Sequence, residues 1–154
     1  MNRFTFTTLA LVAALFFGNA QASFFLGVPV STEVRGEDSV SYLGVQFGTY
    51  DLGGDFGLRG NLRVLPPLGE DPSFQLAGDL LYSSGEETVF YLGAGAGYAV
   101  LNESESLFVG GTIGFDVDAA SLISVFLEAQ PRYNLTAQSV ALYLNTGLNF
   151  HFGE

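Results

Sequence analysis

An alternation with a period of two dominates the chain after residue 22 and constrains its fold more than any other feature. Apolar residues alternate with small or polar residues along eight segments, which are separated by short clusters of Gly, Pro, Ser, Asn and acidic residues. This pattern is typical of β-strands joined by turns. The segments are approximately residues 23–31, 40–50, 55–65, 73–83, 88–100, 106–117, 122–133 and 140–152. Most have a length close to the roughly 9–11 residues that a tilted strand needs to cross a bilayer. An even number of strands lets the last pair with the first, so the pattern predicts an all-β fold, an eight-stranded antiparallel up-and-down barrel with no open edge.

The two faces of these segments differ in polarity. One face is apolar and uncharged, and it includes Leu43, Leu62, Leu76, Leu92, Ile113, Leu127 and Leu148. The other face carries glycine and polar residues, among them Gly44, Gln46, Asn61, Gln75, Gly93, Gly95, Gly97, Asn145 and Asn149. An eight-stranded interior has room for few large side chains, so the apolar face should point outward into lipid.

A soluble barrel or sandwich can share the same alternation. It would need a charged exterior, however, and this chain has no lysine and an uncharged apolar face. Aromatic residues also gather near the ends of the segments, such as Phe56, Tyr82 and Phe90 near one end and Phe74 and Tyr98 near the other. Two such girdles are expected at the two membrane interfaces.

Residues 1–22 have the three parts of a secretory signal peptide. Arg3 supplies the positive charge, residues 9–17 the apolar centre, and Ala20-Gln21-Ala22 a small-residue cleavage site before Ser23. The apolar run is shorter than the roughly 20 residues of a spanning helix. We therefore expect cleavage between Ala22 and Ser23, export, and a mature single domain of residues 23–154.

The mature chain as a whole resembles the small outer-membrane β-barrels of the OmpA and OmpX class. Besides the eight alternating strands, the resemblance rests on the closing pattern Leu144-x-Thr146-x-Leu148-x-Phe150-x-Phe152. In that class the barrel-assembly machinery recognises a similar C-terminal strand. The resemblance therefore implies the outer membrane of a diderm, Gram-negative-type bacterium, with lipid and the assembly machinery as partners.

Charged residues on the inward face are expected to pair, because unpaired charges in so enclosed a space are costly. Counting from the strand ends places Arg59, Asp79 and Glu128 near mid-height, with Glu128 directly across the barrel from Arg59. Arg63 and Arg132 should lie above this layer. Asp116 and His151 should lie below it. We predict that this interior charge cluster closes the barrel.

The connections between segments are acidic on the side that should face outward. There we expect loops at residues 32–39, 66–72, 101–105 and 134–139, with acids at Glu33, Glu37, Asp38, Glu70, Asp71, Glu103 and Glu105. On the periplasmic side we expect turns at residues 51–54, 84–87 and 118–121. The outer acids are ordinary solvated loop residues, a weak surface for divalent cations or a repulsive barrier to anions. With a formal net charge of −11, the chain is not expected to bind nucleic acid.

Few residues could carry catalysis. His151 is the single histidine and there is no cysteine, so no catalytic, metal or cofactor-binding residue is predicted. The pattern favours a non-enzymatic envelope protein with a structural or interaction role. The alternative is a small lipid-modifying barrel, or one that conducts small solutes or lipid; a serine and an acid placed around His151 would favour it.

Overall fold

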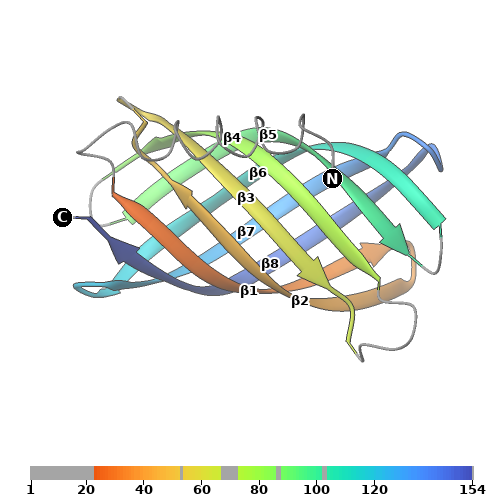
Figure 1. Ribbon diagram of the computed structural model, residues 1–154, viewed down its shortest axis with the longest axis horizontal. Coiled ribbons are helices and arrows are strands. Elements are labelled where there is room, and N and C mark those ends of the chain that lie inside the picture. Colours follow the sequence, from red (N-terminus) through yellow and green to blue (C-terminus); the bar gives the residue numbers. More distant parts are fainter. Residues whose placement is uncertain (1–22, 53, 67–72, 86–87, 102–103, 154) are drawn as a thin grey trace, which may run out of the picture.

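The computed structural model describes residues 23–52, 54–66, 73–85, 88–101 and 104–153. They form one closed barrel in which each strand pairs antiparallel with the next and β8 pairs with β1 (Figure 1). The strands are β1 (Phe24–Arg35), β2 (Asp38–Thr49), β3 (Phe56–Val64), β4 (Phe74–Ser84), β5 (Thr88–Leu101), β6 (Ser104–Ala120), β7 (Ile123–Asn134) and β8 (Ser139–Phe152). The predicted fold class is therefore confirmed, while the expected signal peptide, residues 1–22, lies outside the described residues.

One end of the barrel carries the start of β1 and the end of β8, where Phe24 pairs with Phe152 (Figure 1). We call it the terminal end. The opposite end, which carries the β1–β2 hairpin, is the distal end. No helix in the described part of the chain is long and apolar enough to span a membrane.

Two distal connections are shorter than predicted. Residues 32–39 were expected to form a loop, but β1 continues to Arg35 and β2 begins at Asp38, leaving only Gly36 and Glu37 between them. Gly36 has φ 63°, the left-handed conformation that such a tight hairpin turn requires. Likewise β5 reaches Leu101 and β6 begins at Ser104, so Glu105 belongs to a strand. Sequence alternation is weak where both faces of a hairpin are solvated, which explains these errors.

β6 is also longer than predicted at the terminal end, where it runs to Ala120. The register with β7 shifts between Asp118 and Ala120, a β-bulge of the kind that often marks the rim of a barrel. Asp118 therefore lies in a strand and not in the expected turn.

The two faces of the sheet are as predicted. Large apolar side chains on the outer surface are exposed, with Leu92 59% and Ile113 64% exposed. The polar residues Gln46, Asn61, Gln75, Asn145 and Asn149 are buried inside. Inward glycines make space for these side chains: a Cβ on Gly95 would collide with the Asp79 carboxylate, and one on Gly97 with the Phe108 ring.

Aromatic pairs mark both ends of the lipid-facing surface. At the terminal end the rings of Phe56 and Tyr82 lie 5.6 Å apart and those of Phe90 and Phe115 6.3 Å apart. At the distal end Phe74 and Tyr98 form a similar pair, with centroids 6.4 Å apart. Their positions match those of interfacial girdles.

Candidate functional site: the charged interior

Arg59, Asp79 and Glu128, which we call the central cluster, meet at mid-height in the barrel. Arg59 on β3 faces Asp79 directly across the strand pair and donates to its Oδ2 from Nε at 3.1 Å and from Nη2 at 2.9 Å. Its Nη1 donates to Oε2 of Glu128 on β7 at 2.5 Å. The structure thus brings the three predicted residues together, and one guanidinium joins two walls of the barrel.

Neutral donors add hydrogen bonds to both carboxylates. Glu128 accepts from the Tyr91 hydroxyl at 3.0 Å, from Gln130 Nε2 at 2.9 Å and from Asn145 Nδ2 at 2.8 Å. Asp79 Oδ2 also accepts from Asn61 Nδ2 at 2.7 Å. Because a buried ion pair is tolerated only when its remaining hydrogen-bonding positions are filled, these amides and the tyrosine stabilise the cluster.

Arg63 and Arg132 form a layer on the distal side of the central cluster, as predicted from their positions in the strands. Arg63 donates to Ser31 Oγ and to Gln130 Oε1, each at 2.9 Å. Arg132 donates to Gln75 Oε1 at 2.8 Å and to Gln130 Oε1 at 2.7 Å. Neither guanidinium forms an ion pair with a carboxylate of the described residues.

Two aromatic rings beside Arg132 partly compensate for the missing carboxylate partner. Its Cζ lies 4.2 Å from the centroid of the Tyr143 ring and 4.4 Å from that of Phe108. Cation–π contacts of this kind stabilise a desolvated guanidinium by about 2 kcal/mol or more.

Glu33 is the residue that the sequence interpretation misplaced. It was expected in a solvated outer loop, but its carboxylate is buried inside the barrel. Oε2 accepts from the hydroxyls of Tyr42 at 2.8 Å and Tyr143 at 2.7 Å, and Oε1 contacts the guanidinium of Arg35. The period of two does continue through Gly27, Pro29, Ser31 and Glu33, and extending it by two residues would have placed Glu33 inside.

Asp116 and His151 lie on the terminal side of the central cluster, again as counted from the strands. Ser124 Oγ lies 2.7 Å from His151 Nε2, and the Asp116 Oδ2 lies 4.0 Å from that same nitrogen. In a catalytic triad the serine and the acid bind opposite nitrogens of the ring. Moreover, Asp116 Oδ2 already accepts from Tyr50 at 3.1 Å and Asn149 at 2.7 Å. The arrangement is a hydrogen-bonded rim and lacks the geometry of a nucleophile and its base.

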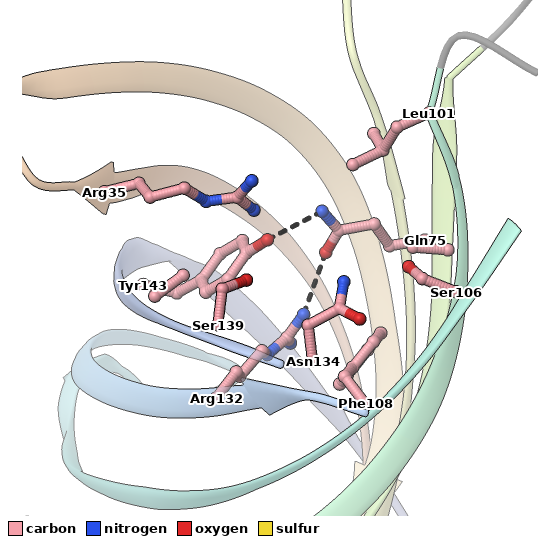
Figure 2. Close-up of a pocket in the computed structure, with 11 residues that line it drawn as sticks. Arg35, Gln75, Leu101, Ser106, Phe108, Arg132, Asn134, Ser139 and Tyr143 are labelled. Carbon is pink, nitrogen blue, oxygen red and sulfur yellow. Dashed lines mark hydrogen bonds between the residues drawn. The ribbon is translucent and has the colours of Figure 1, made fainter. Parts of the chain in front are cut away.

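The central cluster is closed to water. The side chains of Arg59 and Glu128 are 0% exposed and that of Asp79 is 7% exposed. Open space lies instead at the distal mouth, where a small cavity has a volume of about 20 Å³. Arg132, Gln75 and Arg35 are among its lining residues (Figure 2). A wider hollow of about 240 Å³ beside it is lined by Glu33, Asp38 and Tyr42, among others.

No cluster of three or more histidine, cysteine, aspartate or glutamate residues suited to a metal ion exists within the described ranges. Of the acids considered for a divalent-cation surface, Glu37, Asp38 and Glu105 are exposed and Glu33 is buried. Glu70, Asp71 and Glu103 lie outside the described residues.

Comparison with known proteins shows similarity in structure alone. No protein-family model matches the chain, and a search of curated protein sequences gave no match. Among solved structures, the N-terminal β-barrel domain of OprF from Pseudomonas aeruginosa is 14% identical, with a TM-score of 0.64 over 86% of this chain and 98% of that one. A major outer membrane protein from Thermus thermophilus is 14% identical, with a TM-score of 0.59 over 85% of this chain and 100% of that one. Neisserial surface protein A is 12% identical, with a TM-score of 0.55 over 86% of this chain and 97% of that one. The predicted resemblance is thereby confirmed, and the chain has the fold of the small eight-stranded outer-membrane β-barrels.

Proposed function

We propose that this chain is a non-enzymatic outer-membrane protein of a diderm bacterium, with a structural or interaction role in the envelope and a closed interior. The exposed apolar belt fits a lipid environment and would destabilise the protein in water. We further propose that residues 1–22 are removed between Ala22 and Ser23 and that the terminal end faces the periplasm. The exposed, alternating apolar residues of β8 would serve the barrel-assembly machinery as its recognition strand.

The single observation that supports a closed interior is the position of Arg59. Its guanidinium contacts Asp79 on the neighbouring strand and Glu128 on the far wall, and its side chain is fully buried. Passage of a hydrated ion would require this salt bridge to open and its partners to be resolvated. We therefore interpret the central cluster as a plug.

A catalytic role has less support. His151 has a serine and an acid nearby, but both approach Nε2. In acyl transfer the acid binds the other ring nitrogen, where it orients the ring so that the histidine can take the proton of the serine. Ser124 is also 1% exposed and faces the interior, away from any lipid substrate.

Planar-bilayer recording tests the plug. We expect negligible steady conductance for the wild-type protein, and frequent transient openings for Glu128→Ala, which removes one end of the bridge. Glu37→Ala, in the exposed β1–β2 turn, is the matched control and should behave as the wild type. Large, stable single-channel currents from the wild type would refute the plug and identify a pore.

A further inference from the structure

The small distal cavity of Figure 2 has an unusual lining for so acidic a chain. Two guanidiniums, those of Arg132 and Arg35, face it, and no carboxylate belongs to its described lining. The other polar lining residues are Gln75, Ser106, Asn134, Ser139 and Tyr143. The cavity is thus lined by two guanidiniums, that of Arg132 without a carboxylate partner among the described residues and that of Arg35 paired with Glu33, in a protein with a formal net charge of −11.

The charge below this cavity is not balanced locally. Arg132 is 6% exposed and Arg63, beneath it, is 1% exposed, and both donate to the same amide oxygen of Gln130. In addition, Nη1 of Arg63 is buried and has no hydrogen-bond partner among the described residues. Two buried guanidiniums that share a neutral acceptor repel each other, and a nearby negative charge would stabilise both.

Glu33, a carboxylate of the neighbouring hollow, does not supply that charge to the cavity. Both oxygens of Glu33 are occupied, one by Arg35 and the other by the hydroxyls of Tyr42 and Tyr143. Glu33 lines the neighbouring hollow and does not line the cavity beside Arg132.

We propose that this cavity binds one small inorganic anion, of the size of chloride, between the guanidiniums of Arg132 and Arg35. Its volume of about 20 Å³ exceeds the roughly 10–15 Å³ that a single water needs, so it suits a monatomic anion and excludes a bulky organic one. Asn134 adds a neutral donor: its Oδ1 already accepts from the backbone N–H groups of Thr136 and Ala137, which leaves its amide nitrogen to donate.

Bromide, which scatters anomalously and is close to chloride in size, tests the position. Crystals of the detergent-folded protein soaked in sodium bromide should show an anomalous peak in contact with the Arg132 guanidinium. We expect Arg35→Gln, which removes one guanidinium at the exposed rim, to weaken or abolish the peak. Anomalous peaks confined to other surfaces would overturn the proposal.

Stability in solution gives an independent test. At equal ionic strength, chloride should raise the folding equilibrium constant over that in gluconate, which is too large to enter. The increase should be about elevenfold when chloride is at ten times its Kd. Arg35→Gln should lose most of this difference, whereas Glu37→Gln, a neutralisation in the same hairpin outside the cavity, should keep it. If the wild type is equally stable in the two salts, the salts act only by screening charges in general, and the proposed anion site is wrong.

Discussion

Replacing Glu128 by alanine removes the acceptor at the centre of the interior network. Glu128 accepts from four donors, those of Arg59, Tyr91, Gln130 and Asn145. In the variant, Arg59 keeps its ion pair with Asp79, but its Nη1 points into the space that the carboxylate has left. The three neutral donors lose an acceptor in the same step.

The expected loss of stability follows from these contacts. Breaking a buried ion pair by removing one partner costs about 3–5 kcal/mol. The remaining Asp79 contact reduces this figure, while each buried donor left unpaired adds about 1–3 kcal/mol unless water reaches it. Water should enter the vacated space and offset most of the cost of the unpaired donors, so we expect a net loss of about 3–5 kcal/mol.

Urea unfolding from lipid vesicles, followed by far-ultraviolet circular dichroism, measures this loss directly. Glu128→Gln keeps an acceptor oxygen without the charge and should lose less. Glu37→Ala removes an exposed carboxylate of the same length and should stay within about 0.5 kcal/mol of the wild type. If Glu128→Ala unfolds at the same urea concentration as Glu37→Ala, the central cluster does not stabilise the barrel and the reasoning from burial fails.

Three further predictions concern the membrane. Leu92→Arg on the outer face should cost about 2–4 kcal/mol in vesicles, because the arginine would face hydrocarbon. If Leu92→Arg is tolerated, the assignment of the inner and outer faces is reversed. At the next residue, Gly93→Ala should destabilise by crowding, since its Cβ would meet the backbone of Leu80 and the side chain of Leu81. The mature protein should require detergent and show heat-modifiable migration on electrophoresis, and a monomer soluble without detergent would contradict this. N-terminal sequencing of the protein from outer membranes should begin at Ser23, and a retained leader would contradict the proposed cleavage.

Sequence alone predicted the strands and their faces because a barrel wall imposes a strict period of two on every residue that crosses the bilayer. Leu92 and Gly93 are adjacent in the chain yet lie on opposite faces, as the alternation required. The same counting placed Arg59 and Asp79 near the same height, and in the structure they pair directly across β3 and β4. Local periodicity therefore carries three-dimensional information in this fold.

The distal end was predicted less well, and the physical reason is solvation. At the distal end of β2, Asp38, Ser39, Val40 and Ser41 are all exposed, so burial does not distinguish the two faces of the strand there. Glu33 was misassigned because the expected strand ended at Ser31, two residues before it, and because its partners are distant in sequence: Tyr143 lies 110 residues away. No pattern within β1 indicates that two tyrosines from other strands will meet its carboxylate.

The layers of the interior differ in charge, and Gln130 joins them. The distal layer has two guanidiniums, Arg63 and Arg132, whereas the central cluster has two carboxylates around Arg59. Gln130 donates its amide N–H to Glu128 and accepts both distal arginines on its oxygen. Since an amide nitrogen cannot accept and an amide oxygen cannot donate, the negative charge on one side and the positive charge on the other fix its orientation. Loss of Glu128 would remove one of these two constraints and free Gln130 to turn away from the arginines. We therefore expect Glu128→Ala to alter the hydrogen bonds that Gln130 accepts from Arg63 and Arg132 as well.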